Sequence, residues 1–156
     1  MDKNTAYLIT NLLDGVVKNG TGRLFKALKR PVAGKTGTSN NLFDAWFVGY
    51  SPRYITGVWV GFDEEKSLGE GEQGARTASP IWLGFMREIL KDQPIKVFQV
   101  PEGVVFAKID AETGLLPIPE SKETIFECFK EGTVPTEYTS KPDTVTEAED
   151  FFKLDM

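Results

Sequence analysis

The run Lys35-Thr36-Gly37-Thr38 combines an ammonium group, two hydroxyls and a residue without a side chain, and it is the strongest chemical signal in the sequence. It lies in a predicted β-strand, where successive side chains alternate between the two faces. Lys35 and Gly37 are therefore expected on one face, and Thr36 and Thr38 on the other. All four can serve one cleft only if it runs along an exposed edge of the strand. Gly37 would let another backbone approach there, so an extended peptide could add as a further strand.

Residue counts exclude several kinds of catalysis. The 156 residues include no histidine, which excludes Ser-His-Asp and Cys-His catalysis and HExxH zinc sites within the chain. The single cysteine, Cys128, cannot form an internal disulfide, and its aromatic neighbours indicate a buried apolar side chain. The acidic, glycine-rich residues 63–76 match no cation loop and are predicted to form a mobile, solvated loop. We expect no metal and no cofactor, and the net charge of −5 argues against a nucleic-acid partner.

A three-stranded antiparallel meander is expected to carry the Lys35 strand. Its three runs are rich in β-branched and aromatic residues and are separated by short, turn-like sequences, which force antiparallel neighbours. The runs cover residues 32–38, 43–50 and 54–62. The second and third runs are apolar on both faces, so the sheet is expected to need cover on both sides.

Two helices are predicted beside this sheet. Apolar spacing indicates a helix over residues 5–18, with Asn4 or Thr5 as its cap. Ser79-Pro80 is predicted to open a second helix, with Ser79 as its N-cap, that runs to Lys91 and lies across the sheet.

The sequence is divided into two predicted parts, a main domain over residues 1–100 and a C-terminal extension over 101–156. Two candidate strands flank this boundary, Val97 to Val100 at the end of the main domain and Val104 to Ile109 in the extension. From Glu120 onward the acids outnumber the lysines, prolines recur and periodicity is weak, so this segment is expected to be an acidic tail that is at most loosely docked.

Four segments together resemble class A penicillin-binding proteins. One is similar to the family's third active-site motif with the strand that follows it, and the others resemble the approach to that motif, the last sheet strand and the start of the C-terminal helix. The segments are Ala33 to Asn40 with Asp44 to Pro52, Gly20-Thr21-Gly22, Val58 to Asp63, and Thr77 to Trp82. The resemblance covers about residues 5 to 100, with the segments in the family's order.

This resemblance implies an α+β fold, namely part of the penicillin-binding-protein transpeptidase fold that serine β-lactamases share. It implies serine acyl transfer by a peptidoglycan D,D-transpeptidase, which cross-links cell-wall stem peptides and uses the motifs S-x-x-K, S-x-N and K-[ST]-G. Lys35 would position and polarise the proton-transfer network. Thr36 and Thr38 would bind the carboxylate of the donor peptide or a β-lactam. The backbone N–H of Thr38, next to Gly37, would form half of the oxyanion hole.

The sequence departs from the family pattern in one respect that matters for activity. No lysine has a serine three residues before it, and Ser39-Asn40-Asn41 follows the K-T-G-T run, so it is interpreted as a turn. The chain is therefore expected to begin after the first two motifs and to be inactive alone. Its expected partners are the stem peptide and β-lactams in the intact enzyme, and the N-terminal part of the same protein or a second copy through strand pairing. An extracytoplasmic location is expected, with the anchor upstream.

Two alternatives remain open from the sequence. A serine β-lactamase or a D,D-carboxypeptidase shares the K-T-G motif, although the Asp44 to Phe47 segment and the helix at Ser79 favour a class A transpeptidase. The chain could also be a catalytically inert binding or folding module as it stands.

Overall fold

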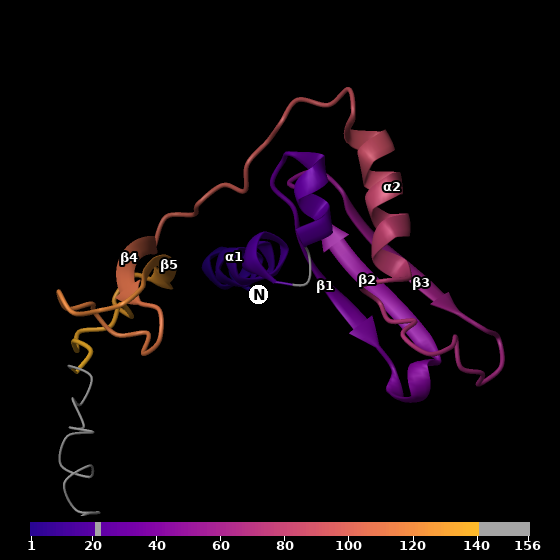
Figure 1. The fold of residues 1–156 in the computed structure, drawn as a ribbon. Helices are drawn as coiled ribbons and strands as arrows, with labels where there is room; N and C mark the ends of the chain where they lie inside the picture. Colours follow the sequence, from indigo (N-terminus) through magenta and orange to yellow (C-terminus); the bar gives the residue numbers. More distant parts are fainter. Residues whose placement is uncertain (21–22, 141–156) are drawn as a thin grey trace, which may run out of the picture. The chain divides into compact units, whose positions relative to one another are not determined.

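The computed structural model describes residues 1–20 and 23–140, which fall into two compact units divided between Gly103 and Val104. The first unit contains two α-helices, two short 3₁₀ helices and one sheet, and the second contains a two-stranded ribbon (Figure 1). The elements in chain order are α1 (Lys3–Asn19), η1 (Arg23–Leu28), β1 (Ala33–Thr38), η2 (Asn40–Leu42), β2 (Asp44–Tyr50), β3 (Ile55–Gly61), α2 (Ala78–Leu90), β4 (Val104–Asp110) and β5 (Thr124–Lys130).

The predicted antiparallel meander is confirmed. The strands follow the order β1-β2-β3, with Lys35 opposite Val48 and Trp46 opposite Trp59. The connection between β1 and β2 turns through positive φ angles at Asn41 and Leu42. In the connection between β2 and β3, the Ser51 hydroxyl accepts hydrogen bonds from the N–H groups of Arg53 and Tyr54. The α+β fold class expected from the sequence is therefore correct.

Both helices form where their sequences predict them, with different caps. Asp2, rather than Asn4 or Thr5, caps α1, because its carboxylate accepts the N–H groups of Asn4 and Thr5 at 3.0 Å. Helix α2 begins at Ala78, so Ser79 is its second residue rather than its N-cap.

One face of the sheet carries the core of the first unit. Helix α2 lies across this face, as Figure 1 shows. The Trp82 ring is fully buried and packs edge-on against Phe25 and Phe47, with 5.0 Å between ring centroids in both pairs. Its indole N–H donates to the Thr56 carbonyl at 3.0 Å, which satisfies the one polar group of the side chain. Burial of these large rings is the main stabilising term available to this unit.

The opposite face of the sheet stays partly open in the described residues. Trp46, Val48 and Trp59 each keep 44% of their surface exposed there. Helix α1 packs beside β1 and contacts this face at Tyr50, whose hydroxyl lies 2.9 Å from that of Thr10. The apolar pattern predicts that both faces of the sheet are covered. Among the described residues, helix α2 covers one face, and the other face is only partly covered.

The second unit is a β-ribbon in which Phe106 pairs with Cys128. The prediction of a loosely docked tail from Glu120 is wrong for residues 124–130, which form β5. The acid count, taken over the whole segment from Glu120, concealed a run of seven residues rich in β-branched and aromatic side chains. Residues 97–100, a candidate strand, pair with no other described strand. Residues 141–156 of the tail lie outside the described residues.

Asp110 closes the turn after β4. Its side chain is buried, and Oδ1 accepts hydrogen bonds from the N–H groups of Glu112 and Thr113 at 3.1 and 3.0 Å. A hydrogen bond from the Ser121 hydroxyl and then the Thr113 amide lower the pKa of Asp110 below its ordinary value. The carboxylate form therefore suits the folded turn better than the acid does.

We expect the second unit to lose stability as the pH falls below about 4 because of Asp110. A depressed folded-state pKa means that the stabilisation is complete above the unfolded pKa and is lost as the pH drops through the folded one. Amide hydrogen exchange in β4 from pH 5 to 2.5 measures this loss. Asp110→Asn should be less protected at pH 5 and respond less to acid, whereas Glu112→Gln, at an exposed side chain, should follow the original protein. Equal acid responses of Asp110→Asn and the original protein would contradict this account.

Candidate active site at the free edge of the sheet

Strand β1 places the K-T-G-T run at an edge of the sheet, because β1 pairs with β2 alone among the described strands. The preceding residues Ala33 and Gly34 are buried, whereas Lys35 and Thr38 are exposed. Gly34 lies against the Phe47 ring, since a Cβ at Gly34 would come 2.6 Å from its Cζ atom. The core thus extends to the residue next to Lys35 and fixes the position of the β1 backbone there.

The side chains of β1 alternate as predicted. Lys35 and Gly37 stand opposite Val48 and Trp46 on the open face. Thr36 and Thr38 stand opposite Phe47 and Ala45, which are buried on the face covered by α2.

The direction of the backbone groups follows from one hydrogen bond at the end of the strand. The Ser39 N–H donates to the Asp44 carbonyl at 3.1 Å. Antiparallel residue pairs alternate between hydrogen-bonded and non-hydrogen-bonded, so the backbones of Gly37 and Lys35 face β2. The N–H and C=O groups of Thr36 and Thr38 face the free edge instead. An extended ligand added at this edge would meet these groups.

The Lys35 ammonium group lies along the same edge. It donates to the Thr36 carbonyl at 2.9 Å and lies 3.4 Å from the Thr36 hydroxyl. None of the ion pairs within residues 1–20 and 23–140 involves Lys35. The site therefore presents a cation, two hydroxyls and an outward N–H on one exposed strand edge, which suits an extended ligand that carries a carboxylate.

The turn after β1 confirms the interpretation of Ser39-Asn40-Asn41. Ser39 precedes η2, Asn40 and Asn41 are its first two residues, and the Ser39 hydroxyl accepts the Asp44 N–H at 2.8 Å. Ser39 thus serves the backbone of the turn.

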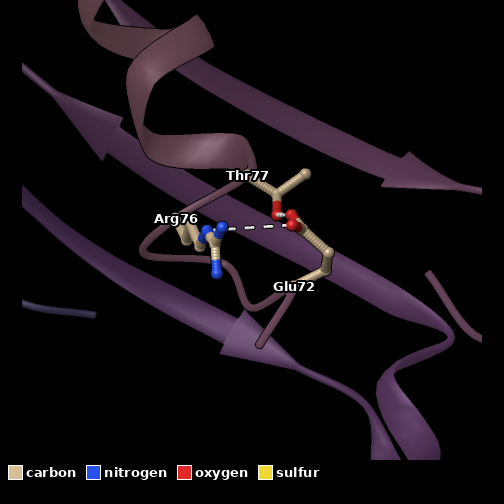
Figure 2. Close-up of polar contacts among 3 residues, drawn as sticks. All are labelled: Glu72, Arg76 and Thr77. Carbon is tan, nitrogen blue, oxygen red and sulfur yellow. Dashed lines mark hydrogen bonds and ion pairs between the residues drawn. The ribbon is translucent and has the colours of Figure 1, made fainter. Parts of the chain in front are cut away.

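The loop between β3 and α2 contacts the site through Gly74. The Gly74 N–H donates to the Thr38 hydroxyl at 3.1 Å. The Glu72 carboxylate accepts a hydrogen bond from the Thr77 hydroxyl at 2.5 Å and lies 3.7 Å from the Arg76 guanidinium. Figure 2 shows these three side chains, which close the turn that contains Gly74. The prediction of a mobile, solvated loop over residues 63–76 is therefore wrong for residues 72–76. Its three glycines were the available signal, but sequence alone did not show that the third approaches β1.

Cys128 remains a poor nucleophile. Burial and, secondarily, the Glu127 charge raise the pKa of its thiol, so the thiolate is disfavoured. The side chain is half-buried rather than fully buried.

The comparisons with known proteins agree on one family. Residues 100–147 match the family model "Penicillin-binding protein 1A, C-terminal domain". The chain is 44% identical over 143 residues to Penicillin-binding protein 1A of Pseudomonas aeruginosa, covering 91% of this chain and 17% of that protein. It is 41% identical over 138 residues to Penicillin-binding protein 1A of Vibrio cholerae, covering 79% of this chain and 17% of that protein.

A solved structure supports the same likeness. The crystal structure of Penicillin-Binding Protein 1A from Haemophilus influenzae matches with a TM-score of 0.80 and 33% sequence identity, over 90% of this chain and 22% of that one. The chain thus spans less than a quarter of the length of each of these relatives. Thr21 and Gly22 of the approach to the motif lie outside the described residues. In the part that the structure describes, no helix combines the length and apolar character of a membrane span.

Proposed function

The chain corresponds to the C-terminal part of a class A penicillin-binding protein, and on that premise we propose that it supplies the K-T-G-T strand to a serine D,D-transpeptidase. The observation that carries this proposal is the free edge of β1, where the Lys35 ammonium donates to the Thr36 carbonyl and the backbone of Thr38 also faces outward. In the intact enzyme this strand would help to cross-link the stem peptides of peptidoglycan.

Each motif residue then has a distinct role. The nucleophilic serine comes from outside these 156 residues and attacks the carbonyl carbon of the acyl donor. Lys35 polarises the network that takes the serine proton and delivers it to the leaving amine. The Thr38 N–H stabilises the oxyanion, and the hydroxyls of Thr36 and Thr38 bind the donor carboxylate. Gly37 leaves room for the donor backbone beside β1.

The names of the matched relatives favour this reading over a serine β-lactamase or a D,D-carboxypeptidase, since each is a Penicillin-binding protein 1A. We further propose that the partners are the stem peptide, β-lactams and the preceding part of the same protein, and that the protein acts outside the cytoplasm. The open apolar face at Trp46 and Trp59 and the free edge of β3 are where that preceding part, or a second copy, would pack.

Intact-mass measurement with benzylpenicillin tests the proposed function. The isolated chain should gain no mass, because it holds no Ser-x-x-K sequence. The complete protein should gain the mass of one benzylpenicillin, and peptide mapping should place the adduct on a serine outside these residues. A stable adduct on the isolated chain, or none on the complete protein, would contradict the proposal.

A further inference from the structure

We propose that Gly74 is a positioning residue for the acyl donor: its backbone N–H orients the Thr38 hydroxyl so that this hydroxyl donates to the donor carboxylate. The inference rests on the proposed function. It assigns a role to a loop residue that lies 36 positions from Thr38 in the sequence and outside the K-T-G-T run.

The chemistry of the hydroxyl carries the first step. A threonine hydroxyl has one hydrogen to donate and an oxygen that accepts. The Gly74 N–H occupies that oxygen at 3.1 Å, since an amide N–H can only donate. The hydroxyl hydrogen is thereby directed away from the loop. Thr38 is exposed, so this hydrogen is available at the strand edge to a carboxylate, which can only accept.

The close approach of the two backbones explains why residue 74 is glycine. A Cβ at Gly74 would come 2.3 Å from the Trp46 carbonyl oxygen and 2.5 Å from that of Gly37. Both oxygens belong to the paired strands β1 and β2 and cannot yield as a flexible side chain could. Gly69 and Gly71 in the same loop have positive φ angles, but Gly74 does not. The requirement at Gly74 is therefore for space above the motif strand, not for an unusual backbone conformation.

Helix α2 holds Gly74 in place from its other side. The Gly74 carbonyl accepts two hydrogen bonds from Ser79, one from its N–H at 2.9 Å and one from its hydroxyl at 3.0 Å. Ser79 is 3% exposed and stands one turn before the core residue Trp82. Gly74 is thus bound to Thr38 through its N–H and to the buried start of α2 through its carbonyl. The docking of α2 on the core therefore fixes the position of the Gly74 N–H beside Thr38.

The test compares acylation of the complete protein by benzylpenicillin and by its methyl ester, which lacks the carboxylate. A positioning role predicts that Gly74→Ala lowers the ratio of the two acylation rate constants, acid over ester, by about tenfold or more, because a hydrogen bond to a charged group is lost. The matched control is Gly84→Ala in α2, where an added Cβ meets nothing within 4 Å. Its ratio should equal that of the original protein.

A second pair of variants covers the case in which Gly74→Ala does not fold. Ser79→Ala removes one of the two donors to the Gly74 carbonyl and should lower the same ratio by about two- to tenfold, and Ser79→Thr should restore it. A ratio unchanged in both Gly74→Ala and Ser79→Ala would overturn the inference, even if both rates fell together, because a purely structural loss lowers both equally. A complete protein that neither compound acylates would instead contradict the proposed function.

Discussion

Replacing Lys35 by alanine in the complete protein should lower the rate of acylation by benzylpenicillin by about 10² to 10⁴-fold, the usual contribution of a proton-transfer partner. The Lys35 ammonium lies at the free edge of β1, 2.9 Å from the outward Thr36 carbonyl, where the acyl donor would add. Alanine keeps the strand but removes the only cation of the K-T-G-T run, so the proton leaving the serine loses its polarising partner.

A control variant at a second lysine distinguishes the loss of the Lys35 side chain from a change of net charge. Lys26→Ala removes the same charge from an exposed position in η1 and should leave the acylation rate near that of the original protein. The thermal unfolding midpoints of both variants should match the original, because neither side chain is buried. A near-normal acylation rate for Lys35→Ala would assign the proton transfer to another group.

Trp82→Ala should lower the free energy of unfolding of the first unit by about 3 to 5 kcal/mol, the cost of removing a large buried aromatic side chain. Its ring is fully buried between Phe25 and Phe47 and sits against Gly49, where a Cβ would come 2.8 Å from the ring. The smaller side chain leaves a cavity beneath the sheet and removes the indole N–H that donates to the Thr56 carbonyl.

The matched control for this prediction is Trp46→Ala on the open face of the same sheet. Trp46 is 44% exposed, so its removal should cost about half as much. Urea unfolding of the 156-residue chain, followed by far-UV circular dichroism, measures both losses through the shift in midpoint at constant slope. Equal losses for the two variants would mean that α2 does not organise the core as the structure indicates.

Local patterns predicted most of the elements that carry the site. The turn-like residues around Ser39 and Pro52 are too few to allow anything except antiparallel neighbours, and this determined the meander and the place of β1 at its edge. The seven-residue strand β5 was not predicted, because its β-strand pattern was averaged with the acidic residues of the same segment. Ser79 was predicted in the correct helix, but as its N-cap rather than as a hydrogen-bond donor to the Gly74 carbonyl.

The sequence by itself determined which groups of the K-T-G-T run lie on each face of the edge strand. The order Lys35, Thr36, Gly37, Thr38 places the cation and the glycine on one face and the hydroxyls on the other, because strand alternation is a local property of the backbone. The absence of histidine agrees with the serine-lysine acyl transfer that the family resemblance implies.

Only the tertiary structure decided which sheet face is covered and what touches the motif. Both faces of β2 are apolar in sequence, yet Phe47 is buried under Trp82 while Trp46 stays half-exposed. The contact between Gly74 and Thr38 depends on where α2 docks, through Ser79. Local sequence patterns determine whether a segment forms a helix or a strand. They do not determine which distant segments come into contact, because docking depends on packing between elements far apart in the chain.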